Sequence, residues 1–445
     1  PRLIAIKAAW KGFLDRPILG WGPENFNVVF NKYYDPRALE LSYQETRFDK
    51  PHNFALEYLV TGGALLTLAY FALFGLLLFE VRRLGDPLWR KVIVAAILAY
   101  FVGELFVFET IGPLLMLYLF LGFVDGGYKE KRNREGRPAV EGSVNLYLLV
   151  ILSVVALSLI YFLHFLTLRA SYYTFEAFQN FVRRRPSQAI EYFRTATSIW
   201  SPYRWNFKRD YATAVAEAYF YNPGLISDDD AVRAVRAMEE ARDEHPLDAY
   251  NHYALVDLYN QISGIDPEKF LAQAEAEAKI ALELSPQRQE VYFSLAKTKS
   301  LEGNNEAALE ILKRTLALNP KVPDAHFYYG LLAFATGDYG TGYDEVKVAM
   351  DMGRRWVNYY EPRVVAGFFA DAGHIDEAIG LYETALKMEP GDLETKIKLA
   401  AAYFFTGKRD LARSYFLEVA KSFDFKKSPF YSQFKPMFES LGLDL

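Results

Sequence analysis

The sequence predicts an all-α protein in which polytopic membrane helices are followed by an α-solenoid of paired helices. Over 445 residues the chain is 51% hydrophobic and 24% charged, ordinary averages for a soluble protein. The apolar residues, however, are concentrated in the first third, in runs long enough to span a bilayer. From about residue 170 the pattern changes to amphipathic helices punctuated by proline. We therefore expect membrane helices over 55–169 and a solenoid over 170–445.

Charge and cysteine content exclude several classes of function. The formal net charge is -5, and an acidic chain is a poor nucleic-acid binder. The chain has no cysteine, which excludes disulfides, thiolate metal sites and a cysteine nucleophile. Residue 1 is proline, and a chemically meaningful motif begins at Arg2. We therefore expect the chain to be a fragment whose upstream part is missing.

Three apolar stretches form the predicted membrane part. Residues 58–79 and 146–168 contain no charged residue, and a bilayer core needs about 20 apolar residues in a helix. Residues 92–124 are apolar but are interrupted by glycine, proline, Glu104 and Glu109. This stretch is either one broken helix or two short ones, and the charges that flank it decide between them.

Basic residues flank residues 92–124 on both sides, and lysine and arginine collect on the cytoplasmic side of membrane helices. An even number of crossings satisfies both flanks, so we expect helices over 92–108 and 111–124 with an outer turn between them. The same reasoning places residues 1–54 and the solenoid outside, and it predicts a multi-pass protein of the cytoplasmic (inner) membrane. The flanking basic residues are Arg82, Arg83, Arg90 and Lys91 before the stretch, and Lys129, Lys131, Arg132, Arg134 and Arg137 after it.

A recurring register marks the solenoid. Pro286 and Pro320 are 34 residues apart, and small residues precede each of them at fixed spacing. Two further steps of 34 reach Arg354 and then fall short of Pro390, which predicts a small insertion in that interval. The register resembles the tetratricopeptide repeat. Its clearest sets are Ala234, Met238, Ala241 and Pro246; Ala274, Ala278, Ala281 and Pro286; Ala308, Leu312, Thr315 and Pro320; and Ala378, Tyr382, Ala385 and Pro390.

The small residues let paired helices approach closely, and the terminal proline stops the second helix of each unit. Weaker units around residues 189–202, 330–349 and 399–419 bring the expected array to about seven. The resemblance implies a concave groove that binds a peptide or a protein partner.

A motif that carries chemistry lies in the first 63 residues. Arg2 precedes Trp10, residues 17–22 form a Pro-x-x-Gly-x-Gly turn, and His52-Asn53 opens the next apolar helix. Together these parts resemble the bacterial O-antigen ligase and polymerase superfamily, over roughly residues 1–124. That family transfers a glycan from a polyprenyl diphosphate carrier to the hydroxyl of a lipid or protein acceptor at the outer face of the membrane, with inversion and without a metal or cofactor.

The resemblance assigns a role to two residues. A diphosphate leaves easily if its charge is held, and Arg2 offers a planar fork of donors that keeps its proton. The acceptor hydroxyl must lose a proton as it attacks, and the imidazole of His52 is the candidate base. The family has about a dozen membrane helices where this chain has about four, so we expect the fragment alone to be inactive.

Supporting roles fall to residues around these two. Gly20 and Gly22 permit a tight turn, with Trp21 between them as an interfacial anchor. Asn53 either holds the imidazole or caps the helix, and Glu57 is either a supporting residue or a first-turn acid favoured by the helix dipole.

Three functions are compatible with this sequence. The first is a ligase whose repeats position an acceptor or partner, and the second is a polymerase that joins two carrier-linked repeats. The third is a non-catalytic membrane-anchored scaffold. The histidines of the solenoid lack metal-ligand spacing, so no metal site is expected.

Overall fold

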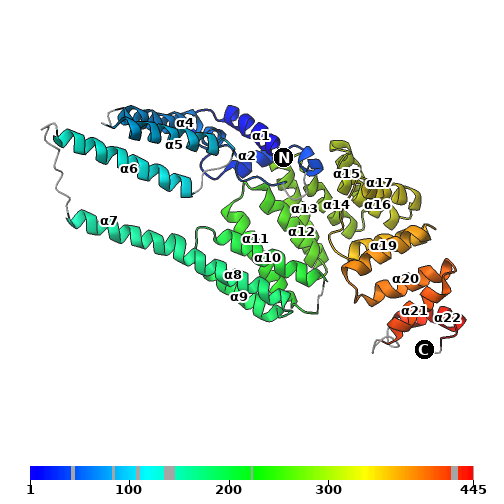
Figure 1. Cartoon of the computed structure of the whole chain (residues 1–445). Helices are drawn as coiled ribbons and strands as arrows, with labels where there is room; N and C mark the ends of the chain where they lie inside the picture. Colours follow the sequence, from blue (N-terminus) through cyan, green and yellow to red (C-terminus); the bar gives the residue numbers. More distant parts are fainter. Residues whose placement is uncertain are drawn as a thin grey trace. The chain divides into compact units, whose positions relative to one another are not determined.

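The computed structural model describes residues 1–41, 46–82, 86–106, 111–134, 146–221, 224–421 and 429–443 (Figure 1). Every regular element in these ranges is a helix, so the predicted all-α class is confirmed. Contacts divide the chain into two compact units, Pro1–Glu302 and Gly303–Leu445.

Three helices lie in the predicted outer segment: α1 (Arg2–Asp15), α2 (Phe26–Lys32) and α3 (Arg37–Leu41). The buried residues of α1 recur at helical spacing and form one stripe, which packs on α2. The resulting core consists of Ile4, Ala5, Ala8, Ala9, Phe26, Val29, Phe30, Tyr34, Ala38, Phe48 and Val60.

The apolar helices α4 (Phe54–Val81), α5 (Pro87–Glu104) and α6 (Ile111–Arg134) lie side by side (Figure 1). Asp86 caps the N-terminus of α5, and Pro87 occupies its first turn, so α5 begins before the predicted residue 92. α6 likewise continues past the predicted end at residue 124. Their shared core consists of Phe74, Leu77, Val81, Ile93, Ile97, Leu117 and Val124.

Two stretches of the described chain are long and apolar enough to cross a membrane, Phe54–Val81 and Leu146–Val182. α6 contains only the shorter apolar segment Leu115–Val124, and α5 does not meet the same criteria. Two of the four predicted crossings are thus candidates by length and composition. Arg83, Glu109 and Arg137, on which the predicted topology partly depends, lie outside the described residues.

The stretch Leu146–Val182 is continuous through α7 (Leu146–Leu159), the π-helical turn η1 (Ile160–Phe165) and α8 (Leu166–Val182). The compositional boundary near residue 170 therefore falls inside a helix. From α8 onward the helices of the first unit form successive antiparallel pairs. These are α8 with α9 (Pro186–Ser198), α10 (Arg204–Tyr221) with α11 (Asp228–Glu244), and α12 (Ala249–Ile262) with α13 (Pro267–Leu284), followed by α14 (Gln289–Leu301).

The second unit continues the pattern of paired helices. α15 (Asn305–Leu318) begins it, and three pairs follow. They are α16 (Pro323–Ala335) with α17 (Tyr339–Asp351), α18 (Tyr360–Asp371) with α19 (Ile375–Met388), and α20 (Leu393–Phe405) with α21 (Arg409–Ala420), before a final helix α22 (Pro429–Ser440).

The small residues of the predicted register lie inside the helix pairs. Ala234, Ala274, Ala308 and Ala378 are each 0% exposed. A larger side chain at these positions would force the paired helices apart, because protein interiors are close-packed. The weaker units obey the same rule, since Ala189, Ala349 and Ala412 are buried as well.

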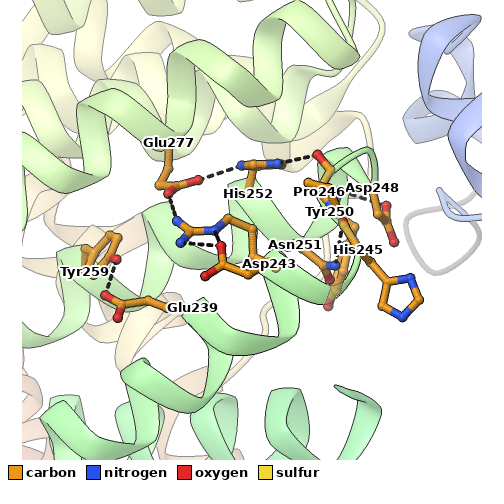
Figure 2. A network of polar contacts seen from close by, with 11 residues as sticks. Glu239, Asp243, His245, Pro246, Asp248, Tyr250, Asn251, His252, Tyr259 and Glu277 are labelled. Carbon is orange, nitrogen blue, oxygen red and sulfur yellow. Dashed lines mark hydrogen bonds and ion pairs between the residues drawn. The ribbon is translucent and has the colours of Figure 1, made fainter. Parts of the chain in front are cut away.

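A second recurring feature ties three of the repeats to the proline before them. The side chain six residues after the proline bonds the proline carbonyl: His252 Nε2 lies 2.8 Å from Pro246 O, Tyr292 OH donates to Pro286 O at 2.9 Å, and His326 Nε2 lies 2.7 Å from Pro320 O. Figure 2 shows the first of these, where His252 also meets Glu277 at 2.6 Å through Nδ1. These bonds satisfy a carbonyl in the turn between two helices.

The predicted insertion is found between α17 and α18. Residues 352–359 connect these helices, whereas the α13–α14, α15–α16 and α19–α20 junctions are four residues long. Arg354 anchors it from a buried position. Its guanidinium bonds Asp324 Oδ1 at 2.9 Å and both oxygens of Glu361 at 3.0 Å, and it lies 3.5 Å from the ring centroid of Phe327. Burial raises the pKa of Asp324 despite the opposing charge of Arg354.

Candidate functional site

The motif turn (residues 17–22) is built into a break in α4. Gly63 has φ 65° and ψ -169°, which interrupts α4 about two and a half turns after its start at Phe54. The amides of Trp21 and Gly22 donate to the carbonyls of Val60 and Thr61 at 2.9 and 2.7 Å. In return, the amides of Ala64 and Leu65 donate to the carbonyls of Pro17 and Ile18 at 2.8 and 3.3 Å.

This exchange replaces the two hydrogen bonds that an unbroken helix would form from Ala64 to Val60 and from Leu65 to Thr61. The two carbonyls and two amides that lose these helical bonds are thus paired, as an apolar environment requires. Because these bonds join backbones, Gly20 lies so close that a Cβ atom there would be 2.5 Å from the backbone of Thr61. A Cβ on Gly63 would lie 2.3 Å from Ile18 O.

Trp21 fastens the motif turn to α1. Its Nε1 donates to Gly12 O at 2.9 Å, and the guanidinium of Arg16 stacks on its ring at 4.0 Å. Nearby, Asp15 accepts hydrogen bonds from Lys32 at 2.6 Å and from Tyr33. These two bonds, the one from Lys32 first, hold the pKa of Asp15 below its usual range.

His52 and Asn53 connect this assembly to the start of α4. His52 has φ 56°, a left-handed backbone conformation that is uncommon for any residue other than glycine, and its ring packs edge-on against Phe48 at 5.7 Å. Asn53 is the N-cap of α4, since its side chain accepts from Leu56 N at 2.9 Å, and it donates to Leu105 O at the end of α5. Of the two roles open to Asn53, the structure shows the cap.

Arg2 lies at the other end of this region, as the first residue of α1. Its side chain is exposed, and no hydrogen bond or ion pair joins it to His52 or to another part of the described chain. The two residues predicted to carry the chemistry are therefore not in contact. α1 nevertheless packs on the core that contains Phe48, the neighbour of His52.

Lys50, which sequence reasoning missed, links Glu57 to the motif turn. Its Nζ lies 3.1 Å from Glu57 Oε1 in the first turn of α4 and 3.1 Å from Glu24 Oε1 just after the turn. Burial alone would lower the pKa of Lys50, but the hydrogen bond and charge of Glu57, with those of Glu24, raise it. Through Lys50, Glu57 therefore stabilises the segment that runs from the motif turn to His52. In the sequence, only the position of Lys50 beside the motif could have indicated this role.

The repeats hold the chain's own N-terminal segment through Asn31 of α2. Asn31 Nδ2 donates to Asp248 Oδ1 at 3.0 Å, its Oδ1 accepts from Arg288 Nη2 at 2.8 Å, and its carbonyl accepts from Ser285 Oγ at 2.8 Å. Asp248, Ser285 and Arg288 lie at the ends of repeat helices, where polar caps are ordinary. Sequence reasoning missed this contact because the residues are up to 257 positions apart.

Arg288 is the centre of this contact. It is 1% exposed, also donates to Thr46 O at 3.1 Å and to Glu290 Oε1 at 3.0 Å, and lies 4.2 Å from the ring centroid of Tyr34. Burial opposes its charge, but Glu290, Tyr34, Tyr253 and Asp248 together outweigh this effect and raise the pKa of Arg288. Tyr34 OH donates to Glu290 Oε2 at 3.2 Å, and burial raises the pKa of Tyr34 well above its usual range.

A cavity of about 810 Å³ lies within the first unit, between the motif turn and the first repeats. Arginine, acidic and aromatic side chains line it from both sides. No cluster of three or more potential metal ligands occurs in the described ranges.

Comparisons with known proteins match two segments in the second half of the chain. Tetratricopeptide repeat models match residues 302–341 and 369–424. The C-terminal region contains tetratricopeptide repeats. This confirms the repeat type predicted from the proline and alanine register. No match to the chain was found among curated proteins.

Several solved structures are similar to part of the chain, and one of them is a tetratricopeptide repeat protein. A thermophilic repeat protein of Thermus thermophilus has 20% identity and a TM-score of 0.35. The match covers 44% of this chain and 99% of the Thermus thermophilus chain. MamA has 22% identity and a TM-score of 0.31, with coverage of 36% and 92%. PilW, a type IV pilus biogenesis factor, has 14% identity and a TM-score of 0.38, with coverage of 50% and 97%.

Proposed function

We propose that this chain belongs to an O-antigen ligase-like glycosyltransferase that moves a glycan from a polyprenyl diphosphate carrier to an acceptor hydroxyl. The observation that supports this most is the assembly of the motif. The motif turn replaces hydrogen bonds of α4, and His52 stands immediately before the same helix. Motif parts separated in the sequence therefore form one structural unit, as a shared site requires.

The chemistry needs one base and one cation. The acceptor oxygen attacks the anomeric carbon, the bond from that carbon to the diphosphate oxygen breaks, and the acceptor proton passes to His52. Arg2 holds the departing diphosphate. A good leaving group needs no carboxylic acid to protonate it, unlike the sugar that a glycosidase releases. The left-handed backbone of His52 supports a functional role, since such conformations collect at active sites.

We place the protein in the cytoplasmic (inner) membrane, with the motif and repeats on the outer side. The long apolar helix through α7 supports this, because none of the α7 side chains is buried. Contiguous apolar surface of this extent needs a cover, which lipid would provide. His52, at the N-terminus of α4, would then lie at the level of a lipid diphosphate.

The test is glycan transfer in membranes that contain the full-length protein, followed as release of carrier from a polyprenyl diphosphate donor. General acid–base catalysis contributes about 10²–10⁴-fold, so His52→Ala should reduce transfer by at least about 10²-fold. Arg2→Ala should also abolish most transfer. His164→Ala and Lys7→Ala are matched controls, one in the exposed apolar helix and one on the exposed face of α1, and both should retain activity.

The product separates the remaining alternatives. Growth of a carrier-linked chain from two carrier-linked repeats would identify a polymerase. A non-catalytic scaffold is the second candidate function, because tetratricopeptide repeats are present and generally bind proteins or peptides. If His52→Ala and Arg2→Ala leave transfer and phenotype intact while substitutions in the repeats abolish the phenotype, the scaffold is correct and the ligase proposal is wrong.

A further inference from the structure

Two loops of the first unit expose large apolar side chains beside the helices that are long enough to cross a membrane. In the motif turn, Ile18 and Leu19 are 69% and 70% exposed. In the loop between α9 and α10, residues 199–203, Trp200 and Tyr203 are 51% and 55% exposed. A single exposed apolar residue is ordinary, but contiguous apolar surface marks an interaction site.

The motif turn is fixed to α4 through its backbone. The amides of Ala64 and Leu65 donate to the carbonyls of Pro17 and Ile18. The apolar run of α4 begins directly after Glu57, so Ala64 lies seven residues, or about 10 Å, inside that run. Leu65 is exposed as well. Ile18 therefore extends the exposed apolar surface of a candidate membrane helix.

The α9–α10 loop is fixed to the other candidate membrane helix, which runs through η1. Ser201 Oγ and Thr167 Oγ1 lie 2.8 Å apart, and the ring of Trp200 packs edge-on against Phe162 at 6.1 Å. The first charged residue after the apolar run is Arg169, so Phe162 lies seven residues, again about 10 Å, inside that run. The two loops thus contact their helices at the same depth below the charge at the helix end.

Lipid at the outer boundary of a bilayer matches both loops. Each headgroup region is roughly 5–8 Å thick, so a point about 10 Å below a charge at headgroup level lies at the start of the hydrocarbon. Isoleucine and leucine are favourable there, and tryptophan is enriched at this boundary. The acid nearest to the motif turn, Asp15, pairs with Lys32 at 2.6 Å, which lowers the cost of bringing its charge near lipid.

We propose that Ile18 and Leu19 of the motif turn and Trp200 of the α9–α10 loop lie in the outer leaflet of the bilayer. The inference rests on the proposed membrane placement and adds a lipid-binding surface outside the apolar helices. A protein partner would have to cover both loops together with the exposed faces of the two helices that hold them. Lipid covers all of these surfaces at once, which favours it as the occupant.

Spin labels at single cysteines measure this depth, because the chain has no cysteine of its own. Leu19→Cys and Trp200→Cys are labelled in the 445-residue chain, which is reconstituted in nanodiscs of phosphatidylcholine and phosphatidylglycerol. Electron paramagnetic resonance compares collisions of each label with oxygen, which dissolves in lipid, and with a water-soluble nickel chelate. Leu152→Cys in α7 is the lipid control, and Lys279→Cys at an exposed position of α13 is the aqueous control.

Labels at residues 19 and 200 should collide more with oxygen than with the chelate, as at residue 152, and the order should reverse at residue 279. An aqueous label at residue 19 or 200 would overturn the proposal, while a lipid signal at residue 152 would still support the membrane placement. An aqueous label at residue 152 would reject both. Shielding of residues 19 and 200 from both reagents would indicate a protein contact and would overturn the lipid surface.

Quenching of tryptophan fluorescence by brominated lipids is a second test, which needs no label. Trp200→Phe should reduce the quenched fraction, whereas Trp356→Phe, in the second unit, should not reduce it. Equal quenching in the wild type and in folded Trp200→Phe would overturn the proposal. Neither measurement depends on catalysis. Lipid contact without glycan transfer by the full-length protein would retain this surface and reject the enzyme, and transfer with aqueous labels would do the reverse.

Discussion

Substitution of Arg288 by alanine is expected to release α2 from the repeats. The change removes hydrogen bonds to Asn31, Thr46 and Glu290 together with the contact over Tyr34. Removing one partner of a buried ion pair costs about 3–5 kcal/mol, because the remaining charge stays buried without its counter-ion. We therefore expect the free energy that holds the docked segment to fall by about this amount.

Hydrogen exchange at the amides of α2, measured on the chain in detergent micelles, reports this release directly. A loss of about 3 kcal/mol corresponds to roughly 10²-fold faster exchange if the amides exchange through undocking. Arg288→Met retains most of the side-chain volume and separates the loss of charge from the loss of packing. Arg236→Ala, at an exposed position of α11, is the control and should change stability by less than about 0.5 kcal/mol.

The result that would refute the reasoning is protection of the α2 amides that stays unchanged in Arg288→Ala while the repeats remain folded. The contacts of Asn31 would then not be what holds the segment. A double-mutant cycle with Asn31→Ala adds a second check, since two residues in one hydrogen-bond network should show a coupling energy of about 0.5–3 kcal/mol. A coupling near zero would point to the apolar contacts of α2 as the cause of docking.

Three further outcomes are expected. Gly63→Ala should lower the thermal unfolding temperature and displace the motif turn, because it places a Cβ atom at φ 65° and 2.3 Å from Ile18 O. The control is Gly75→Ala in the same helix. Its Cβ atom meets nothing within 4 Å, so this variant should be neutral or stabilising. Asp15 has a lowered pKa, so its contribution to stability is present above its unfolded pKa of about 3.9 and is lost as the pH falls through the folded value. Asp15→Asn should therefore flatten the melting profile below about pH 5. Tyr292→Phe should cost about 1 kcal/mol in chemical denaturation by removing the bond to Pro286 O, and Tyr172→Phe at an exposed site should cost nothing measurable.

Local patterns were sufficient to predict much of the fold. Alanine at fixed distances before a proline predicts close helix pairs, because only a small side chain fits between them, and Ala274 and Ala378 are indeed fully buried. The extra residues near Arg354 appear as the longer connection after α17. Apolar length alone predicted the helices at 58–79 and 146–168, but it gave no sign of the break at Gly63.

The candidate site was predictable only in part. The order of Arg2, the motif turn and His52 in the chain identified the region, and the position of Asn53 before an apolar run already suggested a cap. The pairing of the turn with the α4 backbone is invisible in the sequence, since any residue can supply the carbonyls and amides that form it.

Local sequence does not predict that the N-terminal segment docks on the repeats. Asn31 and Arg288 each look like ordinary polar residues of a helix or a helix end. They become partners only when the helix pairs of the first unit bring the ends of α13 and α14 onto α2. Periodicity and side-chain size act within a few residues and thus determine helices and their pairing. The motif assembly, the docked segment and the cavity depend on contacts across as many as 257 positions, which only the folded chain creates.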